Sequence, residues 1–98
     1  MSPQAVQGEK LARSLGCSAC HSIDGSRRTG PTWSGLWGED VTLKDGTTVV
    51  VDDSFVRRSI NEPAADVVDG FSPIMPQFKL SDDQVSALVA YIRSLGTS

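Results

Sequence analysis

The sequence predicts an all-α domain with a small inserted β-hairpin at about residues 41–51. Two observations predict it. Apolar residues recur at helical spacing near both ends of the chain, and an Asp-Gly pair separates two β-rich runs near its middle. The 98 residues contain no internal repeat and no linker, so we expect one domain over residues 1–98.

The first predicted helix is recognised by its two ends. Ser2 is a favourable N-cap residue, Pro3 suits the first helical position, and apolar residues follow at helical spacing. Gly16 ends the run. These signals predict a helix over residues 3–15.

The last predicted helix carries the strongest signals in the chain. Ser81 and Gln84 have the spacing of a capping box, and apolar residues then form a single stripe. Gly96 stands where a helix commonly ends on a glycine. We therefore predict a helix over residues 82–95.

The middle of the chain is predicted to be mostly irregular. Residues 22–40 are interrupted by glycines, and residues 63–79 form a proline-rich loop. Between them, the β-rich runs 41–44 and 47–51 flank Asp-Gly, which indicates a hairpin. A short helix capped by Asp52 or Asp53 follows and stops ahead of Pro63.

Composition limits the classes of function that the chain could have. The hydrophobic fraction is 39%, slightly low for a self-sufficient core in so short a chain, and a large apolar prosthetic group would complete that core. The formal charge of -3 comes without a basic stripe, which argues against a nucleic-acid partner. No stretch is long and apolar enough to span a bilayer, so we expect no direct membrane insertion of this segment.

Residues 17–21 read Cys-Ser-Ala-Cys-His, and this spacing has a specific chemical use. Two thiols three positions apart can each add to one vinyl group of a haem and form thioethers. The residue that follows is then held beneath the iron, where its imidazole can bind. Cys17 and Cys20 are therefore the predicted attachment points of one haem c, and His21 is the predicted first axial ligand.

Four other interpretations of these residues are possible, and the simplest is a chance cluster in a globular core. A disulfide between Cys17 and Cys20 would close a small redox-type ring rather than staple the fold. A thioredoxin-like motif belongs in a βαβ setting, which is absent from the predicted elements. A structural zinc site needs four ligands, and the two cysteines with His21 supply only three.

The second axial ligand is predicted by elimination. His21 is the only histidine and both cysteines are used by the thioethers, so the strong neutral candidates are Met1 and Met75. Met1 is terminal, a poor place for a fixed ligand. Met75 follows Pro73-Ile74 and precedes Pro76, and the flanking prolines restrict the backbone. A lone methionine more often fills a core, but with a haem and no other ligand we predict that Met75 binds its iron.

Other residues could orient the His21 ring or bind the haem propionates, although each also has an ordinary structural explanation. The Pro31 carbonyl could accept a hydrogen bond from His21 Nδ1–H and orient the ring, although Gly30-Pro31 could equally be an ordinary turn. Trp33 and Arg28 are candidate donors to the haem propionates, as are Trp37 and Arg27. It is equally consistent with the sequence that the tryptophans pack in the core and that the arginines are solvated.

These residues resemble a class I cytochrome c over essentially the whole chain. The order that carries the likeness is helix, haem motif, Gly30-Pro31, methionine loop and capped C-terminal helix. The resemblance implies an α-helical fold in which the first and last helices cross near-perpendicularly beside one covalent haem. It also implies a close approach of Gly8 or Ala12 to Leu88 and Tyr91.

A narrower resemblance is to the cytochrome c domain fused to subunit II of caa3-type oxygen reductases. It rests on residues 30–38, the hairpin at 41–51, and residues 59–63 and 70–78. The likeness implies a domain on the periplasmic or outer face of the membrane. It would accept electrons from a soluble donor and pass them to the dinuclear copper centre of the same subunit.

The chain departs from a whole subunit II, because it has no spare cysteines and histidines for the copper centre. We therefore expect a segment of a larger membrane-anchored subunit, with Met1 an added start, that is an electron-transfer domain and no enzyme by itself. The alternatives are a free-standing periplasmic cytochrome c and the cytochrome domain of a dehydrogenase. A haem peroxidase or gas sensor in which Met75 detaches is the alternative of a different class.

Overall fold

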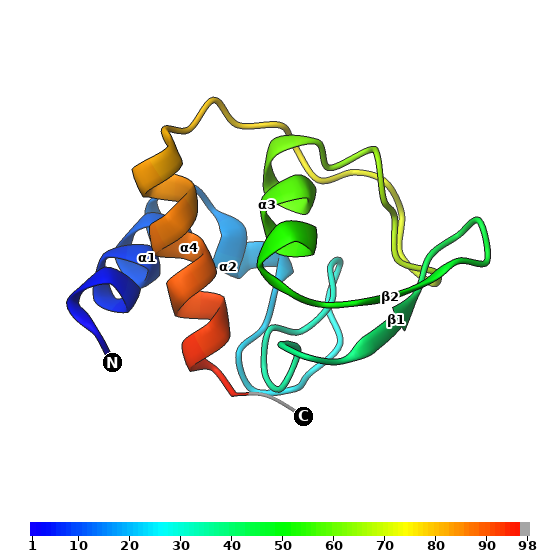
Figure 1. The fold of residues 1–98 in the computed structure, drawn as a ribbon, viewed down its shortest axis with the longest axis horizontal. Coiled ribbons are helices and arrows are strands. Elements are labelled where there is room, and N and C mark those ends of the chain that lie inside the picture. Colours follow the sequence, from blue (N-terminus) through cyan, green and yellow to red (C-terminus); the bar gives the residue numbers. More distant parts are fainter. Residues whose placement is uncertain (97–98) are drawn as a thin grey trace.

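The computed structural model describes residues 1–96, and within them the chain forms four helices and two strands (Figure 1). The elements follow in the order α1 (Pro3–Ser14), α2 (Cys17–Cys20), β1 (Asp40–Thr42), β2 (Thr48–Val50), α3 (Asp53–Asn61) and α4 (Asp82–Ser94). The prediction of a helical domain with one small hairpin is confirmed. The single turn α2 was not predicted.

The predicted helix caps are present. Ser2 Oγ accepts a hydrogen bond from the Ala5 amide at 3.1 Å and starts α1. At α4, Ser81 and Gln84 exchange both bonds of the capping box. Each helix ends one residue earlier than predicted, and Gly96 has a positive φ of 104° beyond α4. Local side-chain chemistry therefore determines both helix starts.

Helices α1 and α4 bring the two ends of the chain together (left of Figure 1). Gly8 faces α4 so closely that a Cβ there would overlap the Ala87 carbonyl and lie 2.8 Å from Tyr91 Cβ. Ala12, one turn further along α1, has an exposed fraction of 0%. The expected close approach of Gly8 to Tyr91 is confirmed, and Ala87 takes the place expected for Leu88 as the other nearest residue.

The hairpin forms where the Asp-Gly pair predicted it, with shorter strands. Its strands are antiparallel, and Val41 is opposite Val49. At the turn, the Asp45 carboxylate accepts a hydrogen bond from the Thr47 amide at 2.9 Å, and Gly46 has a φ of 89°. Each strand has only three residues, so the hairpin depends on contacts outside itself.

Those contacts come from the loop after α3, which the sequence analysis treated as a plain loop. Leu43 forms a β-bridge with Val68, and hydrogen bonds from Lys44 N to Val67 O and from Asp69 N to Thr42 O flank it, both at 2.8 Å. The chain between α3 and α4 thus runs down to the hairpin and then returns to α4 (Figure 1). The hairpin therefore fixes residues 67–69 of this loop.

The core lies between α1, α3 and α4. Its most deeply buried large side chains are Val51, Val85 and Leu88, and α3 contributes Val56 and Ile60. The Asp52 carboxylate caps α3 by accepting a hydrogen bond from the Phe55 amide at 2.8 Å. This packing places α3 against the same core as α1 and α4.

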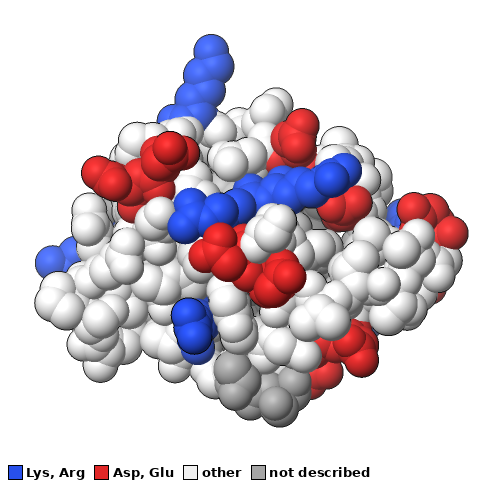
Figure 2. Space-filling view, in the orientation of Figure 1, with Lys and Arg blue, Asp and Glu red and all other residues white. Residues whose placement is uncertain are grey.

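Within residues 1–96 no helix has the length and apolar character needed to cross a membrane. Acidic and basic side chains are interspersed on the face drawn in Figure 2, without an extended patch of one sign. This mixture is consistent with the small formal charge of -3.

Candidate functional site

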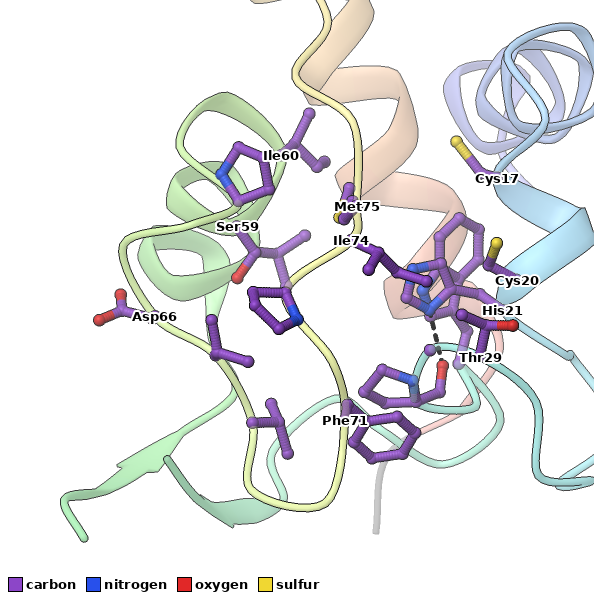
Figure 3. Close-up of a pocket in the computed structure, with 18 of the residues that line it drawn as sticks. Cys17, Cys20, His21, Thr29, Ser59, Ile60, Asp66, Phe71, Ile74 and Met75 are labelled. Atoms are coloured by element: carbon purple, nitrogen blue, oxygen red, sulfur yellow. Dashed lines mark hydrogen bonds between the residues drawn. The ribbon is translucent and has the colours of Figure 1, made fainter. Parts of the chain in front are cut away.

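A pocket of about 220 Å³ lies between the cysteine segment, α3 and the loop that precedes α4. Its walls are mainly apolar and include Leu15, Leu36, Phe55, Ile60 and Ile92. Figure 3 draws the cysteines and the histidine toward one side and α3 toward the other, with Ile74 and Met75 between them. The structure therefore brings the predicted attachment and ligand residues to one apolar pocket.

The turn α2 presents the two cysteines. Gly16 has a φ of 81°, so the chain leaves α1 and starts a new helical turn at Cys17. One turn later Cys20 follows, and the His21 amide donates to the Cys17 carbonyl at 3.0 Å. Both cysteines are free thiols, half-buried, and line the pocket. The turn thus presents two thiols to one cavity, as two thioether bonds to a single haem require.

Burial raises the pKa of the Cys17 thiol, and the neighbouring Cys20 adds to this rise. A backbone hydrogen bond works in the opposite direction. Cys17 is therefore a neutral thiol near pH 7, not a reactive thiolate of the kind found in redox motifs.

The His21 ring is held on two sides. Its Nδ1 lies 2.7 Å from the Pro31 carbonyl oxygen, and its ring stacks on Trp33 with 5.0 Å between centroids. Burial lowers the pKa of His21, while the hydrogen bond with Pro31 partly opposes that fall. A neutral ring that donates Nδ1–H to the carbonyl leaves the Nε2 lone pair free. No hydrogen bond to Nε2 occurs within residues 1–96, so this atom is available to a metal.

Gly30 has a role that the sequence analysis did not identify. A Cβ at Gly30 would lie 2.5 Å from His21 Cε1 and 2.8 Å from Nδ1. The position must therefore lack a side chain for the imidazole to occupy its place. The Gly-Pro pair was visible in the sequence, but its contact with the ring depends on the fold of residues 22–30.

Trp33 packs beneath the histidine and is 6% exposed. Its ring meets Tyr91 of α4 edge-on, with 5.9 Å between centroids. The stack therefore connects the His21 ring to the helical core. Trp33 also lines the pocket, and its predicted hydrogen bond to a propionate stays a prediction.

Met75 is half-buried and lines the same pocket from the loop 63–80. Its neighbour Ile74 also lines the pocket but is 62% exposed, so Met75 is the more buried of the two side chains. The structure thus places the only internal methionine at the pocket that contains His21.

The remaining candidates lie outside the pocket lining among the described residues. Arg28 Nη1 donates to the Ser18 carbonyl at 2.9 Å. Arg27 Nη2 donates to the Gly70 carbonyl at 2.9 Å, and Trp37 lies under the guanidinium of Arg93. The propionate role of Arg28 stays a prediction, as does that of Arg27 and Trp37.

The donor set fits a haem better than a bare metal ion. Within residues 1–96 no group of three or more His, Cys, Asp or Glu side chains could hold a metal, which disfavours the zinc alternative. A haem needs two thiols for attachment, one imidazole and an apolar cavity. All three are present at this pocket, and the imidazole is seated against Gly30, where any side chain would displace it.

Comparisons with known proteins agree with this fit. A family model described as Cytochrome c matches residues 5–96. The solved structure of cytochrome cH from Methylobacterium extorquens is similar with a TM-score of 0.67 and 25% identity, covering 92% of this chain and 97% of that chain. No curated protein sequence matches the chain.

Proposed function

Because the chain belongs to the cytochrome c family and binds one haem c through Cys17 and Cys20, we propose that His21 and Met75 are the axial ligands of a one-electron carrier. The observation that carries this proposal is the shared pocket. His21 offers an Nε2 without a hydrogen-bond partner in residues 1–96, and Met75 lines the same apolar cavity. When bound, the haem supplies a single electron by alternating between Fe(III) and Fe(II).

The protein's own residues fix the properties of that exchange. The Pro31 carbonyl holds His21 in one tautomer, which directs Nε2 toward the cavity and makes the imidazole a stronger donor. The Met75 thioether is a soft neutral ligand that favours the reduced metal and raises the reduction potential. Two protein ligands leave no open coordination site, so the arrangement suits a carrier rather than a peroxidase or gas sensor.

The apolar walls contribute in a second way. Phe55, Ile60 and Ile92 line the pocket and exclude water from it. Because little water is present to reorient, the gain or loss of one electron at the centre of the pocket would reorganise few dipoles. Trp33 and the helical core behind it hold the His21 ring still during the exchange.

A finer proposal concerns the partners. The likeness of residues 30–38 and 70–78 to the domain fused to oxidase subunit II, together with the hairpin, supports a role in a terminal oxidase. In this role the domain faces the periplasm or outer side of the membrane. A soluble redox protein donates the electron and a dinuclear copper domain accepts it.

The carrier proposal is tested by redox titration with visible spectroscopy. We expect a single one-electron wave, and in the ferric protein a far-red band from sulfur-to-iron charge transfer. A high-spin ferric spectrum with rapid peroxide turnover would contradict the carrier assignment. For the finer proposal, stopped-flow mixing of the reduced protein with an oxidised dinuclear copper domain should show fast oxidation of the haem, and no reaction would reject the oxidase role.

A further inference from the structure

The loop that carries Met75 is unusual in how it is attached. Residues 72–80 exchange no backbone hydrogen bond with another segment within residues 1–96; the bond from Ile74 N to Ser72 O is local. The loop nevertheless has to keep a side chain at a fixed point in the pocket. Something other than backbone pairing must therefore hold it.

Two side chains meet this need, Arg27 from outside the loop and Gln77 from within it. Arg27 Nη2 donates to the Gly70 carbonyl at 2.9 Å, and the Arg27 guanidinium lies 4.9 Å from the centroid of the Phe71 ring. At the far end, Gln77 Nε2 donates to the Asn61 carbonyl at the end of α3 at 2.9 Å. One contact precedes Met75 by a few residues and the other follows it.

The two contacts connect the loop to different parts of the fold. Arg27 belongs to the segment that follows His21, so its contact joins the histidine side of the pocket to the methionine side. Asn61 ends α3, which is packed in the core through Val56 and Ile60. The prolines stiffen the backbone between these two points, so restraining both ends restrains Met75 in the middle.

We infer that Arg27 and Gln77 are positioning residues that together hold Met75 at the iron and set how readily another ligand displaces it. Neither side chain lines the pocket, so both act through the loop. The inference rests on the proposed ligation by Met75. Arg27 makes a charge-assisted hydrogen bond and a cation–π contact, so it should contribute more than Gln77.

The test measures the affinity of the ferric holoprotein for added imidazole, which replaces Met75 when the loop opens. Arg27→Met removes all hydrogen-bond donors of the side chain, and we expect imidazole to bind this variant about fivefold more tightly than the wild type. Gln77→Glu keeps the shape of the side chain and loses its donor, and we expect imidazole to bind about threefold more tightly. The double variant should show about the product of the two effects, because the contacts are separate. Arg27→Lys, which keeps a donor, should restore part of the wild-type behaviour.

Two control variants make the same chemical changes on α1. Arg13 pairs with Glu9 at 3.4 Å on the surface, and Gln7 is exposed. Arg13→Met and Gln7→Glu should leave the imidazole affinity unchanged. Denaturant unfolding of all variants separates loop opening from global destabilisation, and we expect Arg27→Met to shift the unfolding midpoint no more than Arg13→Met does.

The outcomes distinguish the two proposals. If wild-type ferric protein has the far-red band and the Arg27 and Gln77 variants bind imidazole as the wild type does, this inference is wrong and ligation by Met75 stands. If the wild-type band is missing, both proposals fail. Increased affinity in the controls as well would also reject a specific role for these two side chains.

Discussion

The two sides of the pocket are built in different ways. On the histidine side the chain folds back on itself, since Gly30 N donates to Cys20 O at 2.9 Å and Trp33 N donates to Ser22 O at 2.8 Å. The Trp33 ring also supports His21 directly. On the methionine side, residues 72–80 have no such backbone pairing within the described chain. The Arg27 contact before this stretch, the Gln77 contact within it, proline stiffness and the packing of Leu80 against the core hold it instead.

This difference indicates which of the two proposed ligands is the more easily lost. The His21 position is a consequence of folding, because the residues that hold it belong to the core or hydrogen-bond to each other. Met75 lies on a loop whose residues 72–80 exchange no backbone–backbone hydrogen bond with α1, α3 or α4. Segments with few buried contacts and few backbone hydrogen bonds open at lower free energy than the rest of a protein.

The largest effect should come from damage to the helical frame that both sides share. Gly8→Ala places a Cβ against the Ala87 carbonyl, so α1 and α4 have to separate. We expect a loss of about 3 kcal/mol or more in the free energy of unfolding. Denaturant titration measures it, with Gln7→Ala on the exposed face of α1 as the control within about 0.5 kcal/mol of wild type.

The comparison is tested directly by removing each ligand in turn. His21→Ala should destabilise the holoprotein by about 2–3 kcal/mol, because the ring's contacts with Trp33 and Pro31 are lost with the ligand. Met75→Ala should cost about 1 kcal/mol, leave the haem attached and lower the midpoint potential. Unfolding curves and redox titrations measure these effects.

Equal stability of the His21→Ala and Met75→Ala variants would contradict the difference between the two sides. An unchanged potential in Met75→Ala would show that the thioether is not a ligand. Val50→Ala, at an exposed position on β2 outside the pocket lining, is the control and should keep the wild-type potential.

A smaller effect should follow from crowding the histidine without removing it. In Gly30→Ala the new Cβ displaces the imidazole, and we expect a loss of about 1–2 kcal/mol with a changed visible spectrum. Pro31→Ala keeps the carbonyl that His21 uses and serves as the control. A wild-type spectrum in Gly30→Ala would show that the ring has more room than the structure indicates.

The smallest effect should be a pH dependence of the haem-free chain. Burial depresses the pKa of His21 in the folded state, whereas in the unfolded state it is close to about 6.5. Between these values the unfolded chain binds more protons, so the free energy of unfolding should fall as pH drops below about 6.5. Urea titrations from pH 7 to 5 measure this, and the drop should be reduced in His21→Gln.

Much of this arrangement could be predicted from local sequence signals. Ser2, Ser81 and Gln84 cap helices through bonds to residues three positions away, and Asp45-Gly46 needs only its own turn. The haem motif is likewise contained in five consecutive residues. Features of this kind depend on residues that are close in the sequence and not on contacts with distant parts of the chain.

The features that were missed depend on contacts between distant segments. The Leu43–Val68 bridge joins the hairpin to a loop with no strand pattern of its own. The contact of Gly30 with the His21 ring and that of Arg27 with Gly70 require the folded pocket. Sequence periodicity reports a residue's own element, and it carries no information about which remote backbone atom that residue meets.

The central claim is that one axial ligand is held by the folded core and the other by a separately anchored loop. Residue-by-residue amide hydrogen exchange on the oxidised holoprotein tests it most directly. We predict that the amides of Met75 and residues 77–80 exchange at least about a hundredfold faster than those of His21, Trp33 and residues 85–92. Equal protection of the methionine loop and α4 would contradict the account.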